Sequence, residues 1–107
     1  MIDYDGRRFK GHAPDAPVAT YRQDGEVVWS QWSGGDVRRG SLAGLCAPDG
    51  TVSFAYCMVL TDGRVVSGHS VNTPEFLPDG RIRLNERWER FGANAASGTS
   101  SIEEVAG

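Results

Sequence analysis

Short stretches of β-branched and aromatic residues alternate with polar positions along this chain, and turn sequences separate one stretch from the next. Asp-Gly and Gly-Gly pairs in these turns supply the positive φ angles of tight hairpins, and a period of two is typical of a half-buried strand. The pattern predicts strands at 17–23, 26–33, 36–46, 51–60, 64–72, 74–77 and 81–91, and an eighth strand from 2–10 or from 99–105.

The order of these segments indicates an all-β fold. Strands at near-regular spacing, with a turn between neighbours, are typical of an up-and-down antiparallel meander. We therefore expect residues 1–107 to form one domain, a small closed β-barrel of about eight strands. The segment 92–98 has no apolar periodicity and carries glycine at both ends, so we expect a loop there.

Turn chemistry predicts the register of neighbouring strands. The sequences Ala47-Pro48-Asp49-Gly50 and Leu77-Pro78-Asp79-Gly80 suit a type I turn followed by a glycine bulge, whereas Gly34-Gly35 and Asp62-Gly63 suit two-residue turns. The first two turns predict the pairs Gly44–Phe54, Leu42–Tyr56, Gly40–Met58, Phe76–Ile82 and Glu75–Arg83. The two-residue turns predict the pairs Trp29–Gly40 and Tyr56–His69.

These registers give the sheet one apolar face, which we expect inside the barrel. Its residues are Val27, Trp29, Leu42, Val52, Phe54, Tyr56, Met58, Leu60, Val65 and Val71, with Gln31, Arg38 and His69 among them. The opposite face carries small residues and the valines Val28, Val59 and Val66. Such a surface would suit close packing of a second subunit, so we expect a homodimer.

The segment 81–90 places charged residues on an apolar face, because Glu86 and Arg90 alternate in phase with Ile82, Leu84 and Trp88. A bare buried charge costs several kcal/mol, so such groups are paired or hydrogen-bonded. One interpretation is an ion pair of Glu86 with Arg90 or Arg38. A second is a polar patch in an apolar cup, which is how small-molecule sites are built. A helix is a third, since Leu84, Trp88 and Phe91 also fall at helical spacing.

The second interpretation names a set of candidate ligand-binding residues. They are Trp29, Arg38, Tyr56, Met58, His69, Glu86, Trp88 and Arg90. His69 with Glu86 could also act as an acid–base pair, although no nucleophile or triad motif accompanies them. Since His12 and His69 are the only histidines and neither has ligands at metal-binding spacing, we expect no metal and no cofactor.

Charge and cysteine content narrow the function classes. The formal net charge is −3, so no basic field attracts nucleic acid. No apolar run reaches the roughly 20 residues of a membrane span, and the charged N-terminus does not resemble a signal peptide, so we expect a cytoplasmic protein without a membrane partner. The predicted register separates Cys46 from Cys57 by about 16 Å at 3.3 Å per residue, too far for a disulfide.

Four stretches carry a resemblance to a known family, and they are Ser33-Gly34-Gly35, 40–45 (GSLAGL), 79–88 (DGRIRLNERW) and 97–105 (SGTSSIEEV). They are similar to an uncharacterised family of small bacterial proteins of about 110 residues, often filed under the name N-acetylglutamate synthase. The resemblance spans most of the chain apart from its first 20 residues. Acetyl-CoA enzymes employ an Arg/Gln-x-x-Gly-x-Gly/Ala loop before a helix, and no such helix is expected in this β-rich chain, so we do not expect acetyltransferase activity.

Three functions follow from these observations. The first is a small-molecule-binding barrel that resembles lipocalin-like and avidin-like cups, with His69 and Glu86 in an open interior. The second is a structural or interaction module that acts as a homo-oligomer through its outer face. The third is a small enzyme using Glu86 and His69, which requires both groups at one cavity.

Overall fold

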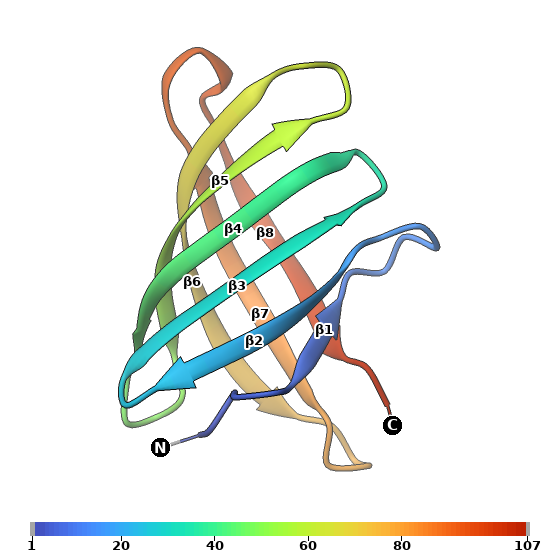
Figure 1. Cartoon of the computed structure of the whole chain (residues 1–107). Coiled ribbons are helices and arrows are strands. Elements are labelled where there is room, and N and C mark those ends of the chain that lie inside the picture. Colours follow the sequence, from blue (N-terminus) through green and yellow to red (C-terminus); the bar gives the residue numbers. More distant parts are fainter. Residues whose placement is uncertain (1, 107) are drawn as a thin grey trace.

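Eight antiparallel strands close into a barrel, in which each strand pairs with the next along the chain and β8 pairs with β1 (Figure 1). This computed structural model describes residues 2–106, so residues 1 and 107 of the predicted domain lie outside the described residues. The strands are β1 (Arg8–Lys10), β2 (Val18–Asp24), β3 (Val27–Gly34), β4 (Val37–Cys46), β5 (Val52–Leu60), β6 (Val65–Phe76), β7 (Ile82–Arg90) and β8 (Ala96–Glu104). The predicted all-β meander, closed into a barrel of about eight strands, is confirmed.

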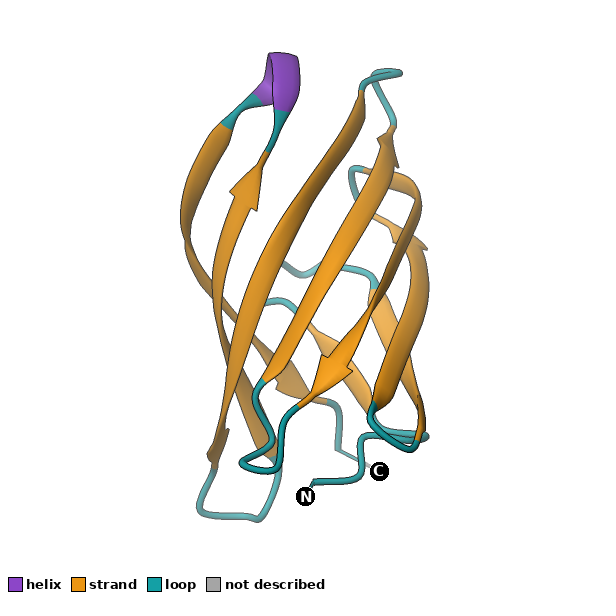
Figure 2. Cartoon of the chain, turned by 90° about the vertical axis from the view of Figure 1, so that its left-hand side faces the viewer, coloured by secondary structure: helices purple, strands orange, loops and turns teal. Residues whose placement is uncertain are grey.

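The two segments proposed as alternatives for the eighth strand, 2–10 and 99–105, both contain strands in the structure. Part of 2–10 forms β1, and β8 begins earlier than the predicted 99–105. The loop predicted at 92–98 is therefore too long: a single 3-10 turn, η1 (Gly92–Asn94), connects β7 to β8 at the end of the barrel away from the termini (Figure 2). Residues 96–98 are extended because they pair with the last residues of β7, Trp88 to Arg90. The helix considered for 81–90 is wrong, since this segment is β7.

The predicted strands 64–72 and 74–77 are one continuous strand, β6, which passes through Pro74. Pro74 pairs with Leu84 of β7. On the other side, β5 pairs with β6 only as far as Asn72. Proline lacks a backbone donor and is tolerated where a strand has no second neighbour, so it does not interrupt β6.

Three hairpins use the same turn. In each, two backbone hydrogen bonds of 2.8–3.0 Å enclose three loop residues, at 48–50, 61–63 and 78–80. The third loop residue is a glycine at φ near +90°, which is the geometry of a type I turn with a glycine bulge. The second is an aspartate, whose Oδ1 accepts a hydrogen bond from the backbone N–H two residues later. The turns predicted at 48–50 and 78–80 are confirmed, together with the five strand pairs derived from them.

The two-residue turn predicted at Asp62-Gly63 is wrong, because Thr61 belongs to the loop as well. The additional loop residue shifts the register, so that Tyr56 pairs with Gly68 and His69 pairs with Ala55. A shift of one residue moves every side chain of a strand to the other face of the sheet. The residues of β6 that were predicted to point into the barrel therefore point outward, and those predicted to point outward point inward.

The hairpin between β3 and β4 differs in a similar way. Gly34 and Gly35 both have positive φ, and the register shifts between Trp32 and Gly34. As a result Trp32, rather than Trp29, pairs with Gly40. The predicted inner face is therefore wrong for β3 and, as described above, for β6. The residues that line the outside are Val27, Trp29, Gln31, Val65, His69 and Val71, and those inside are Val28, Ser30, Trp32, Val66, Ser70 and Asn72.

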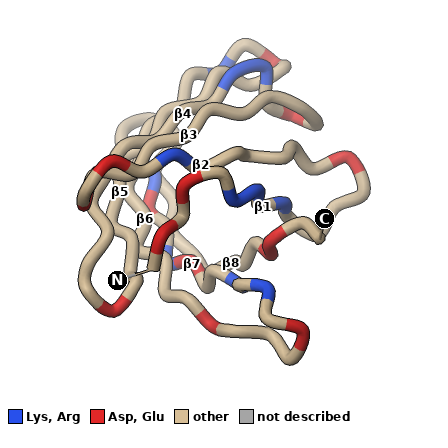
Figure 3. Tube along the Cα trace, turned by 60° about the horizontal axis from the view of Figure 1, so that its bottom comes forward, with Lys and Arg blue, Asp and Glu red and all other residues tan. Residues whose placement is uncertain are grey.

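One half of the barrel is filled by a compact core around Tyr4, Phe9 and Tyr21, whose ring centroids lie 5.0–6.2 Å apart. The hydroxyl of Tyr4 donates a buried hydrogen bond of 2.6 Å to the backbone oxygen of Gly50, so the N-terminal segment plugs this end. Ile82 and Leu84 of β7 are fully buried in the same core. Figure 3, which looks from this end, shows the charged residues around the rim and turns. The other half of the barrel holds fewer buried side chains.

Cys46 and Cys57 are both free thiols, as the register predicts. Cys46 is buried and pairs with Val52, whereas Cys57 lies exposed further along β5. Among residues 2–106 no helix is long and apolar enough to cross a membrane.

Candidate functional site

A cavity of about 320 Å³ occupies the barrel interior beyond the core. This volume is within the range of roughly 300–1,000 Å³ that is typical of small-molecule sites. Its walls come from all eight strands and from the loop between β1 and β2. The lining residues are Phe9, Gly11, Ala16, Pro17, Ala19, Tyr21, Trp32, Leu42, Phe54, Tyr56, Met58, Ser70, Glu86, Trp88, Arg90, Ser100 and Ile102. The walls are therefore mainly apolar and aromatic, with a few polar groups.

Strand β7 crosses the cavity and changes character along its length. Its inward side chains are, in order, Ile82, Leu84, Glu86, Trp88 and Arg90. The first two belong to the filled core, and the last three face the cavity. The alternation that makes β7 a strand thus presents a carboxylate, an indole and a guanidinium in succession to the same space.

Three aromatic side chains of the cavity lie directly opposite glycines of a neighbouring strand. The pairs are Trp32–Gly40, Tyr56–Gly68 and Trp88–Gly98. A Cβ atom added to any of these glycines would collide with the ring opposite it. The sequence thus places glycine where an indole or phenol must lie flat along the wall, and this packing leaves the middle of the barrel open.

Glu86 lies in a cluster of polar side chains, which we call the polar cluster: Ser70, Asn72, Glu86 and Ser100. Asn72 and Ser100 pair with Glu86 from the strands on either side. The Ser70 hydroxyl donates to Asn72 Oδ1 at 2.6 Å, and Asn72 Nδ2 donates to Glu86 Oε2 at 2.8 Å. The Ser100 hydroxyl donates to Glu86 Oε1 at 3.0 Å. Both carboxylate oxygens therefore accept a bond from a neutral donor.

The environment of Glu86 disfavours its charge. Burial raises the pKa of its carboxyl group, and the hydrogen bonds from Asn72 and Ser100 only partly offset this. Among the described residues Glu86 forms no ion pair. The ion pair with Arg90 or Arg38 that the sequence suggested is therefore absent.

Arg90 lies over the ring of Trp88, with its Cζ atom 5.6 Å from the ring centroid. This is a cation–π arrangement. Tyr56 is close to both charged groups that β7 directs into the cavity: burial raises the pKa of its phenol, Arg90 opposes this rise and Glu86 adds to it. Arg90, Trp88 and Tyr56 thus form one side of the cavity, separate from the polar cluster along β7.

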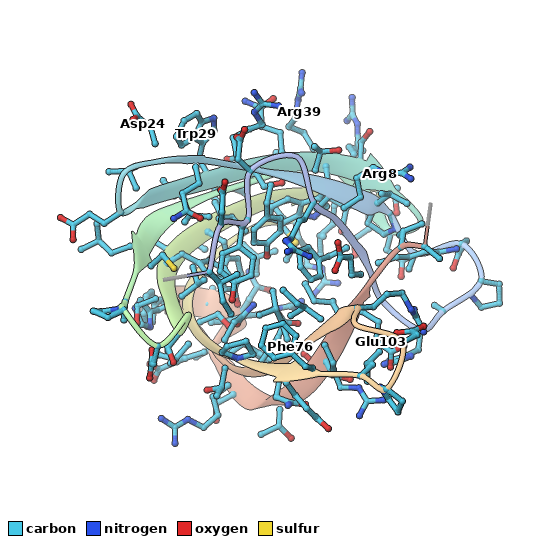
Figure 4. All side chains as sticks on the ribbon, turned by 90° about the horizontal axis from the view of Figure 1, so that it is seen from below. Arg8, Asp24, Trp29, Arg39, Phe76 and Glu103 are labelled. Atoms are coloured by element: carbon cyan, nitrogen blue, oxygen red, sulfur yellow. The ribbon has the colours of Figure 1, made fainter. Side chains whose placement is uncertain are left out.

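The structure brings together five of the eight candidate residues. Tyr56, Met58, Glu86, Trp88 and Arg90 all line the cavity. Trp29 and His69 do not, because they lie exposed on the barrel exterior, and Arg38 does not, because it is an exposed residue at the β-bulge of β4. Figure 4 shows Trp29 pointing away from the barrel wall. His69 was assigned to the interior through a turn whose length was wrong, and Trp29 through a hairpin whose register shift between Trp32 and Gly34 was not foreseen.

Sequence reasoning missed Trp32, Ser70, Asn72 and Ser100. A signal for two of them was present: Thr61-Asp62-Gly63 has the same Asp-Gly spacing as the other two three-residue turns. Treating it as the same turn would have placed Ser70 and Asn72 inside. Hydrophobicity alone could not show which face of β6 lies inside the barrel, because both faces carry valine.

The corrected register also separates Glu86 from His69. Glu86 faces the cavity, while His69 lies on the outer face of β6 between Ala55 and Glu89. An acid–base pair at one cavity, which the enzyme hypothesis required, is therefore not formed by these residues. Among residues 2–106 no group of three His, Cys, Asp or Glu side chains could hold a metal ion.

The barrel wall is incomplete beside Ser100. Strand β1 pairs with β8 only at Phe9–Glu104 and Lys10–Glu103, and beyond this the chain leaves as the loop 11–17. His12 of that loop bridges the gap through a 2.9 Å hydrogen bond between its Nε2 and the Ser101 hydroxyl. A groove of about 900 Å³ begins at this seam and extends over β8, β7 and β6, and Glu86 is among its lining residues.

Comparison with known proteins gives one match. The family model described as avidin-like protein matches residues 2–105. No curated protein and no solved structure matches the chain. These findings neither support nor contradict the N-acetylglutamate synthase name of the family that the sequence resembles.

Proposed function

The chain belongs to the avidin-like family, and we propose that it is a binding protein that holds a small organic molecule inside its barrel. The observation that carries this proposal is the interior cavity of about 320 Å³. Apolar walls with a few convergent polar groups are the usual composition of such a site. The avidin-like barrel, a fold that typically binds small ligands, supports the same function.

The loop 11–17 offers a test of this function. Ala16 lines the cavity, whereas Ala13 of the same loop is exposed and does not. We expect Ala16→Trp to fill the space that a ligand needs, and Ala13→Trp to leave it free. The two variants add the same side chain within one short loop, so they form a matched pair.

The measurement is thermal melting of the two variants and the wild type against a library of small metabolites. A ligand at a hundred times its Kd stabilises a protein by about 2.7 kcal/mol, which raises the Tm of a small domain by several degrees. We expect compounds that raise the Tm of the wild type and of Ala13→Trp but not of Ala16→Trp. A library without any stabilising compound, or equal shifts in all three proteins, would argue against binding in the cavity.

We also propose that two copies associate through the outer face of β3 and β4. Here Val27 pairs with Leu45, and Trp29 pairs with Ala43. Val27, Trp29 and Leu45 are 46%, 40% and 53% exposed, so neighbouring large apolar side chains face solvent on a single subunit. This surface differs from the one expected, because Val28 and Val66 are buried inside the barrel.

Light scattering at micromolar concentration tests this association. The wild type is expected to have the mass of a dimer, and Leu45→Glu that of a monomer, because the new charge would be buried without a partner. Thr99→Glu adds the same charge to the outer face of β8 and should remain a dimer. A monomeric wild type would refute the proposal and leave the ligand-binding function unaffected.

A further inference from the structure

The carboxylate of Glu86 has acceptor capacity that the protein leaves unused. An ionised carboxylate offers about four acceptor positions. Asn72 Nδ2 and the Ser100 hydroxyl donate one hydrogen bond each. Both donors are neutral, and Glu86 lines the cavity. A ligand in the cavity therefore meets a negative charge with free acceptor sites.

The groups around Glu86 do not neutralise that charge. Arg90 lies four residues further along the same strand, which separates the two Cα atoms by about 13 Å at 3.3 Å per residue, and its guanidinium is stacked on Trp88. The other titratable groups that face Glu86 are the phenols of Tyr21 and Tyr56, whose pKa values are raised by burial and by the charge of Glu86. Among the described residues, the polar cluster therefore contains one acid and no base.

The aromatic walls favour the same kind of ligand. The rings of Trp32, Tyr56 and Trp88 line the cavity into which Glu86 points. The faces of these rings carry partial negative charge and attract cations within about 6 Å. A positive group here would be stabilised by the carboxylate together with the rings of Trp32 and Tyr56, since Arg90 already lies over the ring of Trp88.

From these observations we infer that the ligand carries a protonated nitrogen, as an amine or amidine attached to an apolar or aromatic body, with its N–H groups directed at Glu86. This inference rests on the proposed ligand-binding function and names the chemical class for that same cavity. Binding would supply the counter-charge that the polar cluster lacks, and two or more N–H groups would occupy the free acceptor positions of Glu86.

The test compares probes of nearly equal size and different charge: benzylammonium, benzyl alcohol and benzoate. Affinities are measured by titrating the isotope-labelled protein and following its amide signals. The wild type should bind benzylammonium at least tenfold more tightly than benzyl alcohol, and benzoate most weakly. Glu86→Gln should lose this preference. Glu89→Gln makes the same change on the outer face of β7 and should keep it.

The outcomes separate the inference from the function on which it rests. If benzyl alcohol or benzoate binds in the cavity as tightly as benzylammonium, the inference of a cationic ligand is wrong and the binding function stands. If none of the probes shifts signals of cavity residues, the binding function itself is contradicted. The comparison within the wild type decides the matter even if Glu86→Gln fails to fold.

Discussion

At the scale of the residue, Glu86 is a cost to folding that the protein retains. Its charge is buried among neutral donors, and burial raises its pKa above the ordinary value. The folded protein therefore holds a proton at pH values at which the unfolded chain has released it. By linkage, this contribution to stability is fully present below the ordinary pKa of a glutamate, about 4.3, and is lost as the pH rises through the higher folded pKa.

Glu86→Gln is therefore expected to be more stable than the wild type at neutral pH. The gain is about 1.4 kcal/mol for each unit by which the pKa is raised, because glutamine removes the charge while it can keep partners in Asn72 and Ser100. Melting curves between pH 4 and 8 should show the advantage shrinking as the pH falls. Glu89→Gln, which alters an exposed carboxylate, should not show this trend. A loss of about 3–5 kcal/mol at neutral pH would instead reveal a broken buried ion pair.

Alternation alone placed Glu86 inside the barrel, and this prediction is confirmed. Its partners could not be predicted in the same way. Asn72 was assigned to no face, and Ser100 belongs to a segment that the sequence left as one of two possibilities for the eighth strand. The partners of a buried charge depend on the register of both neighbouring strands, and an error in either changes the answer.

At the scale of the element, turn length decides which face of each strand is buried. Pro48 and Pro78 made two of the three equivalent turns recognisable, since proline suits their first loop position. Thr61 takes that position in the third turn, and its backbone N–H donates to Asp36 of the neighbouring hairpin at 2.9 Å. Proline would lack this donor. A contact between distant segments thus explains why the local sequence signal was weaker there.

The same dependence accounts for the error at β3. Gly34 and Gly35 suggested a two-residue turn, but the register shift beside them turns Trp32 inward and Trp29 outward. Each face of β3 carries one valine and one tryptophan, Val27 with Trp29 and Val28 with Trp32, so hydrophobicity gave no means to distinguish the two faces. The strands themselves were predictable from local composition, whereas their inward faces required the exact geometry of each connection.

At the scale of the whole molecule, the barrel is divided into a filled half and an open half. Tyr4, Phe9 and Tyr21 occupy one end, and the cavity begins where β7 passes from Leu84 to Glu86. The closed eight-strand meander could be predicted from its turns. The division into a filled half and an open half could not be predicted, because it depends on how the N-terminal segment folds back under the barrel to bring the Tyr4 hydroxyl onto the backbone oxygen of Gly50.

The most direct test of the central claim, a ligand site inside the barrel, uses the three tryptophans of the chain. Trp32 and Trp88 line the cavity, while Trp29 is on the exterior. Their indole N–H signals can be followed by NMR during a titration with benzylammonium and, separately, with benzyl alcohol, after assignment with single Trp→Phe variants. A ligand site inside the barrel predicts that at least one of the two probes causes saturable shifts of the Trp32 and Trp88 signals and leaves the Trp29 signal unchanged. A shift confined to Trp29, or no shift of any indole with either probe, would contradict it.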